Sequence, residues 1–278
     1  MTTTTATREA LTVGTLPGAA VRSFAPTLAS LPVSFTPATP DEFPDVTVID
    51  GGAPWPLEVA DAIRAGSRGV IVSAPSITDP ADVRAAADLA EQHGASIVLA
   101  EPYAGDPGLL ANQTDITHHM AAVDTVSIKH IDVDADSDAD SQLLAVLRTA
   151  RAIGYPGIDV VTYMRTGHGF TASGVARNGA VFAGLGVRSS GAQEGQSVRG
   201  YGFARTVAVD LYGAATASPA LISYTNVEGE LRVPTVYETA DRAAWKRLKS
   251  TLTAPGSQSL ITLRDFADDL ETVLAARP

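Results

Sequence analysis

Short apolar runs alternate with helical patterns in the first half of the chain. Three runs have the length and β-branching of strands buried on both faces: Val46 to Ile49, Gly69 to Val72 and Ser96 to Ala100. The segments between them are long enough to be crossover helices. This repetition of strand, crossover and strand predicts a parallel, doubly wound sheet, and such sheets bind ligands beyond the carboxyl ends of their strands.

The residues before these runs predict a further strand and helix. Ala10 to Val13 has the pattern of a first strand, and Ala19 to Ser30 has that of a helix. The next segment, Leu31 to Pro44, is short and rich in proline, with Val33 to Thr36 as a candidate strand. A helix is expected from Asp106 to Met120, after the last of the three runs. The parallel half is therefore complete in outline but shortened.

The pattern changes after about residue 120, where alternating apolar and polar positions predict strands. The expected strands are Val123 to Ile131, Ile158 to Arg165, Gly169 to Ala176, Ala180 to Arg188, Phe203 to Leu211, Ala215 to Tyr224 and Glu230 to Val233. Asn178-Gly179 and Glu228-Gly229 lie between runs, and Asn-Gly is a strong hairpin signal. These features predict an antiparallel sheet. The expected helices are Gln142 to Ile153, Asp241 to Leu252 and Leu263 to Ala276.

The two patterns together predict an α/β half followed by an α+β half. We expect a shortened Rossmann-like domain with a doubly wound parallel sheet in residues 8–122. An α+β domain with an open antiparallel sheet is expected in residues 123–278. We also expect the last helix to pack back on the N-terminal domain.

Composition narrows the classes of function. The 278 residues carry 31 acidic and 20 basic side chains, a formal charge of -11, and no basic stripe, so a nucleic-acid partner is not expected. No apolar run approaches the roughly 20 residues that span a bilayer, and the first residues lack a secretory signal, so we expect a cytoplasmic protein that does not insert into membranes. The absence of cysteine excludes disulfides and thiolate metal sites.

A run of alternating aspartates invites comparison with a calcium loop. The run consists of Asp132, Asp134, Asp136, Asp138 and Asp140. In such a loop Ser137 would stand at the turn glycine and Leu143 at the bidentate glutamate, so the match fails. We interpret the run as a solvated loop that ends in a helix cap, and we expect no metal site.

The turn after the first strand has part of a phosphate-binding pattern. Gly14 and Gly18 are present, but a dinucleotide-binding turn has three glycines, and Pro17 removes a backbone donor. The candidate strand before Pro37 is followed by no acidic residue until Asp41, where a ribose-binding acid would be expected earlier. An ordinary strand-to-helix turn is favoured over a phosphate loop.

The order of residues between Pro54 and Pro75 resembles the Gfo/Idh/MocA oxidoreductase family. The pattern consists of Pro54, Glu58, Ala62, Ala65-Gly66 and Gly69 to Val72, which precede the position of the family's E-K-P motif. The resemblance continues through Asp79 to Pro107 and, more loosely, through Val227 to Leu231. It implies the fold of NAD(P)-dependent sugar and inositol dehydrogenases. It also implies oligomers that associate through the open sheet.

The chemistry that the resemblance implies is incomplete. Ser73-Ala74-Pro75 stands at the E-K-P position, so alanine replaces the lysine that contacts the sugar hydroxyl and the nicotinamide ribose. The family's histidine would fall around Asp138 to Gln142, where none is present. If a cofactor site survives, the resemblance assigns it Gly14, Gly18, Ser73 and Pro75; the cofactor is therefore either none or NAD(P).

Four other residues are candidates for the site. Tyr103 and His168 are the candidate catalytic residues, because proton abstraction needs a titratable group within hydrogen-bond reach. Tyr163 and Arg165 are candidates for substrate binding, because aromatic faces and guanidinium donors suit sugars or carboxylates. For each of them a structural role, in packing or on the surface of the sheet, is the competing interpretation.

Two main hypotheses follow. In the first, the protein has lost hydride transfer and is a non-catalytic subunit that binds a sugar-type ligand or has a structural role. In the second, it is an active NAD(P)-dependent oxidoreductase of a sugar-like alcohol with a relocated acid/base. A lyase or isomerase is a third possibility that no candidate nucleophile favours. A homo-oligomer, or a hetero-oligomer with a paralogue from the same family, is expected through the open sheet.

Overall fold

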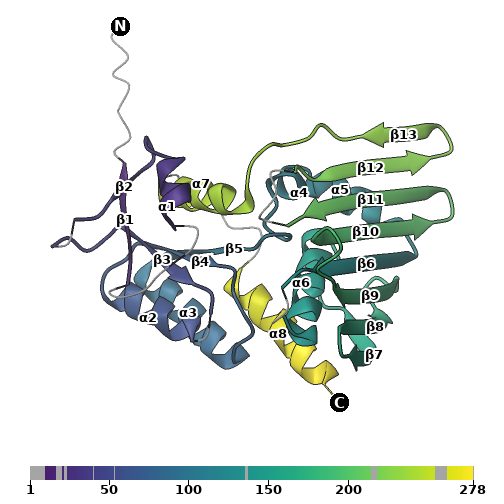
Figure 1. The fold of residues 1–278 in the computed structure, drawn as a ribbon, viewed down its shortest axis with the longest axis horizontal. Helices are drawn as coiled ribbons and strands as arrows, with labels where there is room; N and C mark the ends of the chain where they lie inside the picture. Colours follow the sequence, from purple (N-terminus) through teal and green to yellow (C-terminus); the bar gives the residue numbers. More distant parts are fainter. Residues whose placement is uncertain are drawn as a thin grey trace, which may run out of the picture.

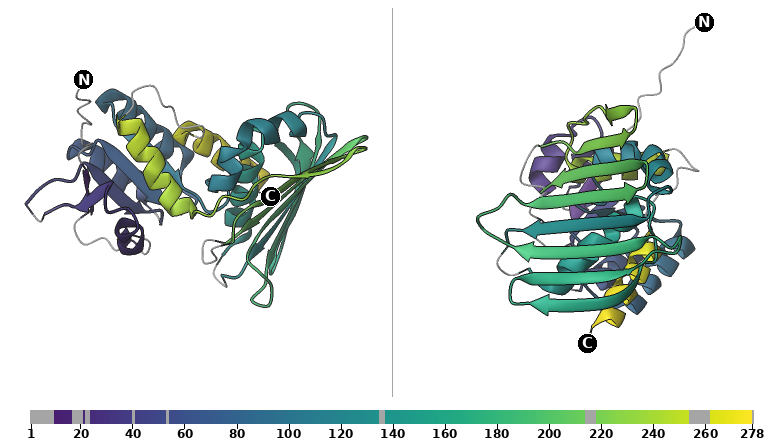
Figure 2. Two further views of the ribbon diagram at one scale, coloured as in Figure 1. Left: turned by 90° about the horizontal axis from the view of Figure 1, so that it is seen from above. Right: turned by 90° about the vertical axis from the view of Figure 1, so that its right-hand side faces the viewer.

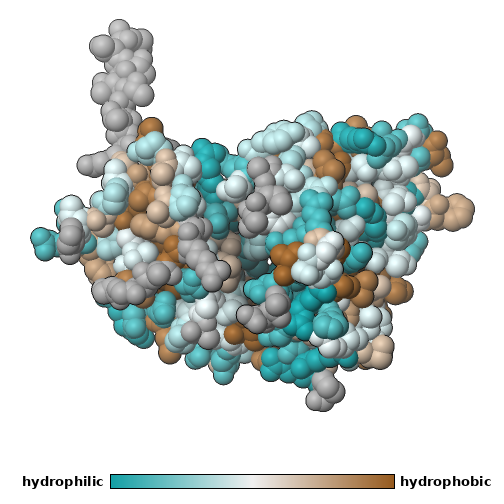
Figure 3. All heavy atoms as spheres, viewed as in Figure 1, coloured by the Kyte–Doolittle hydropathy of each residue, from teal (hydrophilic) through white to brown (hydrophobic). Residues whose placement is uncertain are grey.

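The structure is a computed structural model with two sheets connected by helices (Figure 1). It describes residues 10–16, 21, 24–39, 41–52, 54–134, 137–213, 218–253 and 262–277. The surface of the same view carries hydrophilic and hydrophobic residues in small, interspersed groups, and its upper outline is notched between the two halves (Figure 3).

The first sheet is parallel, as the sequence predicts. Its strands are β1 (Leu11–Thr15), β2 (Phe35–Pro37), β3 (Val46–Asp50), β4 (Gly69–Ser73) and β5 (Ser96–Ala100). They lie in the order β2-β1-β3-β4-β5, and every pairing between them is parallel. The order reverses at β1, which is the arrangement of a doubly wound sheet.

Helices from both ends of the chain cover this sheet. On one face lie α2 (Trp55–Arg64) and α3 (Pro80–His93); α3 begins at the side-chain cap Asp79 and ends at left-handed Gly94. On the other face lie α1 (Phe24–Ala29) and α7 (Ala240–Thr253). The α1 helix is shorter than predicted, although residues 19, 20, 22 and 23 of the expected helix lie outside the described residues.

The second sheet has eight strands. They are β6 (Thr125–Asp132), β7 (Asp159–Thr166), β8 (Gly169–Val175), β9 (Val181–Arg188), β10 (Gly195–Gly202), β11 (Arg205–Tyr212), β12 (Leu221–Asn226) and β13 (Gly229–Arg232). Their order is β13-β12-β11-β10-β6-β9-β8-β7. All pairings are antiparallel except β6 with β9, which is parallel. The expected hairpin at Asn178-Gly179 is confirmed, with Gly179 at φ +87° between β8 and β9.

The sequence did not predict β10, because glycines interrupt its alternation. Gly200 faces the helical layer, where an added Cβ would lie 2.8 Å from the sulfur of Met120. A side chain at this position would therefore press on the helix below. The predicted antiparallel sheet is confirmed with one exception: β6, at the centre of the sheet, pairs in parallel with β9.

Helices cover one face of the second sheet, and no described residue covers the other (Figure 2). The covering helices are α4 (Pro107–Ala111), α5 (Gln113–Met120), α6 (Ala139–Ala152) and α8 (Leu263–Ala276). Where one helix was predicted from Asp106 to Met120, the chain bends at Asn112, whose side-chain amide donates to the carbonyl of Gly108 at 2.8 Å. The predicted cap is confirmed: the Asp138 carboxylate accepts from the amide of Ser141 at 2.7 Å.

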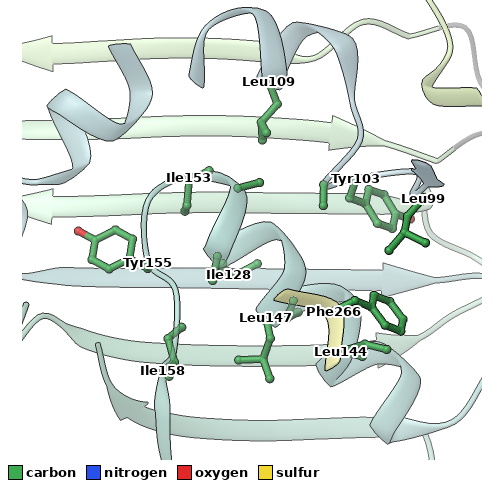
Figure 4. Packing of buried hydrophobic residues seen from close by; sticks show 14 of the residues in the cluster. Leu99, Tyr103, Leu109, Ile128, Leu144, Leu147, Ile153, Tyr155, Ile158 and Phe266 are labelled. Carbon is green, nitrogen blue, oxygen red and sulfur yellow. The ribbon is translucent and has the colours of Figure 1, made fainter. Parts of the chain in front are cut away.

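A continuous hydrophobic cluster joins the two halves. It runs from residues of α2 and β4 through Tyr103 and α6 to the inner face of the second sheet. Figure 4 shows Tyr103, Leu144 and Phe266 gathered at one end of this cluster. The last helix, α8, packs against both α3 and α6. The boundary proposed between residues 122 and 123 stays a prediction.

Candidate functional site

A cavity of about 300 Å³ lies at the carboxyl ends of β4 and β5, against the second sheet. Its walls are Ala74 to Ile77 after β4, Glu101 to Ala104 after β5, His130 and Asp132 on β6, Ser137, Ser141, Leu144, Ala145 and Arg148 on or near α6, Glu194 before β10, and Phe266 on α8. This is the position at which open parallel sheets bind their ligands. We therefore take it as the candidate site.

The segment after β4 forms one wall and is held on both sides. The amide of Ala74 donates to the carbonyl of Ala100 at 3.1 Å. The amide of Ser76 donates to the carbonyl of Gly51 at 2.7 Å. Ala74 has a φ of +49°, which is uncommon for a residue with a side chain. It is exposed and contributes a methyl group where the family resemblance places a lysine amine.

A buried ion-pair network crosses the floor of the cavity. Arg148 is 2% exposed and donates to both carboxylate oxygens of Glu101, at 2.7 and 2.9 Å, and to Asp269 at 2.9 Å. Burial by itself would lower the pKa of Arg148, but the charges and hydrogen bonds of Glu101 and Asp269 raise it. Arg151 donates twice to the same Asp269, at 2.8 and 2.7 Å. The network ties the end of β5 to α6 and α8.

Tyr103 is buried in the cavity wall and is bound to a carboxylate. Its hydroxyl donates to Glu194 Oε1 at 3.1 Å. Burial, the charge of Glu194 and its hydrogen bond, and the charge of Asp132 all raise the pKa of Tyr103 above its usual value. The phenol therefore stays protonated at neutral pH, and its proton is already shared with a carboxylate. The catalytic role of Tyr103 stays a prediction.

His130 and Asp132 form a second polar group on β6. His130 is 3% exposed. Its Nδ1 lies 3.2 Å from the side-chain nitrogen Nε2 of Gln196, and its Nε2 lies 3.8 Å from a carboxylate oxygen of Asp132. Burial would raise the pKa of Asp132, but the neighbouring His130 and hydrogen bonds from Ser137 and the amide of Asp134 lower it to about 2. Asp132 is therefore ionised throughout the neutral range and acts as a hydrogen-bond acceptor.

The cavity thus presents carboxylates held by neighbouring side chains. Glu101 is held by Arg148, Asp132 by His130, and Glu194 by Tyr103. Each carboxylate has lone pairs beyond those bonds. Leu144 and Ala145 contribute apolar surface between the polar groups. An apolar wall with a few placed acceptors suits a small ligand rich in hydroxyl groups.

The structure separates the residues that the sequence proposed for the site. Tyr103 and Pro75 line the cavity, and Ser73 precedes its first wall. His168 lies in the turn between β7 and β8, is exposed, and is not among the cavity residues. Gly14 lies in β1, and Gly18 lies outside the described residues.

Tyr163 and Arg165 meet at a different place. The Tyr163 hydroxyl donates to Asp140 at 2.7 Å, and Arg165 donates to the same buried carboxylate at 2.8 Å. Arg277 near the end of α8 also donates to it, at 2.9 Å. Arg165 lines a second hollow of about 350 Å³ beside the first turn of α6. Their substrate-binding role stays a prediction. In the structure, Tyr163 hydrogen-bonds to Asp140 and Arg165 offsets its charge.

The described part of the nucleotide half does not fit a nicotinamide dinucleotide. A Cβ added to Gly14 would lie 3.3 Å from the side chain of Pro44, so packing occupies the space on that side of this glycine. The α1 helix has six residues and begins well after β1. Ala38 and Thr39 follow β2, where a ribose-binding acid would be required.

Carboxylates also lie at the carboxyl end of β3, the strand next to β1. Asp50 ends β3, and its side chain accepts from the amide of Gly52 at 3.0 Å. Glu58 lies in the first turn of α2, and its pKa is raised by burial and by the negative charges of Asp50 and Asp61. Two mutually repelling acids at the carboxyl end of a central strand disfavour an anionic group there.

Five polar site residues were missed in the sequence: Glu101, His130, Asp132, Arg148 and Glu194. Asp132 was expected in a solvated loop, but it ends β6 and lines the cavity. His130 lies in the buried phase of β6, beside Val126 and Ile128, so its position in the alternation was an available signal. Arg148 falls on the buried side of α6, where a charge needs a partner. Glu194 lies just before the unpredicted β10, and no signal marked it.

The described residues lack two features. They contain no group of three or more histidine, aspartate or glutamate side chains placed to hold a metal ion. Within the same residues no helix is both long and apolar enough to cross a bilayer.

Comparisons with known proteins agree on the fold. No family model matches the sequence, and no curated protein matches it. Among solved structures, the chain is similar to KijD10, a 3-ketoreductase from Actinomadura kijaniata in complex with TDP-benzene and NADP, with a TM-score of 0.72 and 12% identity over 96% of each chain. It is also similar to the UDP-N-acetylglucosamine 3-dehydrogenase GnnA from Acidithiobacillus ferrooxidans, with a TM-score of 0.72 and 13% identity over 97% of each chain.

A third similar structure is an aldose-aldose oxidoreductase from Caulobacter crescentus complexed with glycerol. Its TM-score is 0.72 at 13% identity, over 96% of this chain and 97% of that one. These neighbours are Gfo/Idh/MocA-type sugar oxidoreductases, so the fold that the sequence resemblance implied is confirmed. At this sequence identity the similar structures share the fold of this chain, but their ligands are not assigned to it.

Proposed function

We propose that the protein binds a small, sugar-type polyhydroxylated ligand in the cavity at the ends of β4 and β5 and does not transfer hydride. The observation that carries this proposal is the pairing of a formed cavity, lined by carboxylates, with a nucleotide half whose described residues lack the features of a dinucleotide site. The similar structures support a sugar-type ligand, because their names describe enzymes of sugars and sugar nucleotides.

The cavity groups also support a non-catalytic role. Tyr103 is bound to Glu194 with its pKa raised, Asp132 has a pKa of about 2, and Glu101 accepts two bonds from Arg148. An efficient general base has a pKa near the working pH and an unshared lone pair facing the substrate. None of these three side chains meets both conditions.

Calorimetry with the purified protein tests the loss of hydride transfer. We expect no heat of binding for NAD(H) or NADP(H) up to millimolar concentrations, because Asp50 and Glu58 oppose the phosphates and Gly14 is covered by Pro44. A variant with Asp50→Asn serves as the control, because binding that appears only in it would identify charge as the obstacle. Micromolar binding to the unaltered protein would contradict the proposal.

The second candidate is an active NAD(P)-dependent oxidoreductase of a sugar-like alcohol. What favours it is that Tyr103 and His130 lie in the cavity with their ring centroids 5.3 Å apart, so titratable groups do face the ligand space. A screen of sugars for an absorbance change at the reduced-nicotinamide band would establish it. Loss of that activity in His168→Ala or Tyr103→Phe would then identify the acid/base.

We also propose that two copies associate through the uncovered face of the eight-stranded sheet. Val175, Val181 and Leu185 are exposed on β8 and β9, and Val175 and Val181 are direct cross-strand partners. Towards the centre, Arg199 donates to Asp210 at 3.0 Å within the same face. A twofold axis would place the apolar side chains of β8 and β9, and the charged pair beside them, against the same residues of a second copy.

The mass of the particle in solution tests this association. We expect the unaltered protein to elute as a dimer or larger, and Leu185→Lys to shift it towards the monomer. Leu57→Lys is the matched control, because Leu57 is also exposed but lies on α2, away from the sheet. A monomeric unaltered protein would contradict the homo-oligomer; purification with a paralogue from its host would indicate a hetero-oligomer instead.

A further inference from the structure

The cavity walls carry an excess of negative charge. Glu101, Asp132 and Glu194 line it, and Arg148 is the arginine that lines it with them. The charge of Arg148 is already met by Glu101 and, below the floor, by Asp269. Asp132 and Glu194 are left facing the cavity without a guanidinium or ammonium partner among the residues that line it.

These two carboxylates line the same cavity as Tyr103. The Tyr103 hydroxyl donates to Glu194 at 3.1 Å. His130 contacts the edge of the Tyr103 ring and also lies against Asp132, with Nε2 3.8 Å from its oxygen. The cluster therefore holds two acceptors at fixed positions around the phenol.

The backbone around Glu194 restricts where its carboxylate can move. The amide of Gly213 donates to the carbonyl of Glu194 at 3.2 Å, and a Cβ added to Gly213 would overlap the Glu194 carboxylate. This glycine lets the side chain fold across the end of β11 towards Tyr103. Asp132 is similarly fixed through its bond from the amide of Asp134.

An ammonium group satisfies such a pair better than a hydroxyl or an anion. It donates three hydrogen bonds and carries the opposite charge, and charge-assisted bonds are about twice as strong as neutral ones. A phosphate or carboxylate would instead be repelled by both side chains. Building on the proposed function, we propose that the cavity selects a sugar-type ligand carrying a primary amine, whose ammonium group binds between Asp132 and Glu194.

Calorimetry with matched sugar pairs tests this selectivity. The probes are glucosamine against glucose and galactosamine against galactose, with glucose 6-phosphate as the anion, in a buffer without a primary amine. We expect each amino sugar to bind at least about tenfold more tightly than its hydroxyl counterpart, a difference of about 1.4 kcal/mol. The phosphate ester should bind more weakly than glucose.

Two variants assign the selectivity to the cluster. Asp132→Asn and Glu194→Gln should each remove most of the preference for the amine while leaving the affinity for the neutral sugar closer to its original value. Asp61→Asn and Glu230→Gln make the same changes of charge on α2 and β13, away from the cavity, and should keep the preference. A melting temperature for each variant shows that it is folded.

The outcomes are distinguishable. Equal binding of the amino and neutral sugars, or tighter binding of the phosphate ester, would overturn the charge selectivity and leave the proposed sugar-type ligand standing. A preference that survives in both cavity variants would overturn the assignment to Asp132 and Glu194. Failure of every probe to bind would overturn the proposed function together with this inference.

Discussion

Replacing Arg148 by methionine is expected to destabilise the protein strongly. The substitution keeps most of the volume of the side chain but removes three hydrogen bonds and the charge that lies between Glu101 and Asp269. Asp269 retains two bonds from Arg151, at 2.8 and 2.7 Å. Glu101, which is 7% exposed, loses both of its bonds from Arg148, so it is the charge left buried without that partner.

The magnitude follows from this asymmetry. Removing one member of a buried ion pair typically costs about 3–5 kcal/mol of unfolding free energy. For domains of roughly this size, each kcal/mol lowers the melting temperature by about 2–4 °C, so Arg148→Met should lower it by roughly 6–20 °C. Differential scanning calorimetry and urea unfolding at pH 7 measure both quantities.

The second substitutions identify the stranded charge. In the Arg148→Met background, Glu101→Gln should recover a large part of the loss, whereas Asp269→Asn should not, because it leaves Glu101 charged and removes one of the two carboxylates that Arg151 binds. Arg84→Met is the control: Arg84 also binds α8, through Asp268 at 2.8 Å and through Glu271, but this pair is exposed and should matter far less. Equal effects of the Arg148 and Arg84 substitutions, or equal rescue by the two second changes, would refute the reasoning.

Two further predictions concern the ends of β3 and β6. Gly51→Ala should lower the free energy of unfolding by about 1–3 kcal/mol, because the added Cβ would overlap the carbonyl oxygen of Ala74 in the cavity wall. Gly52→Ala should leave the stability nearly unchanged. Equal melting temperatures of the two variants would contradict this prediction. Asp132 has a folded pKa of about 2, below its ordinary value of 3.8, so its stabilising contribution is present above pH 4 and is lost as the pH falls towards 2. Urea unfolding should therefore show that Asp132→Asn is less stable than the unaltered protein by about 1 kcal/mol at pH 5, after allowance for solvent screening. This difference in unfolding free energy should shrink below pH 3. A difference that does not change with pH would instead indicate an effect of packing.

Local patterns were enough to predict the elements with strong periodicity. The runs that became β3, β4 and β5 are continuous, apolar and bounded by turn residues, so a parallel sheet was readable from them. The turn at Gly179 and the cap at Asp138 were readable for the same reason, because a specific residue type meets a local geometric need. In contrast, the glycines of β10 serve contacts with another layer, and these weaken the pattern within the strand itself.

The candidate site was harder to predict because distant residues build it. Arg148 and Asp269 are separated by 121 positions, and Tyr103 and Glu194 by 91. A sequence pattern indicates that Arg148 faces inward but not which carboxylate it meets. For His168, the sequence suggested a site because its side chain can titrate. In the structure it lies exposed in a turn. Spacing along the chain is informative within one helix or strand and loses its meaning once the partner comes from another sheet.

The helix α7 has a consequence for the order in which the protein folds during synthesis. Ala244, Trp245 and Leu248 of this helix pack on Val48, Ile71 and Val98 and cover one face of the parallel sheet, although all eight strands of the second sheet are encoded before them. A chain emerging from the ribosome therefore holds the first sheet with one apolar face covered only in part, by α1, until nearly the whole second half has been made. Such a face is a target for chaperones and for other nascent chains. We expect the two halves to mature together late in synthesis, with the first sheet reaching its final stability after α7 has docked.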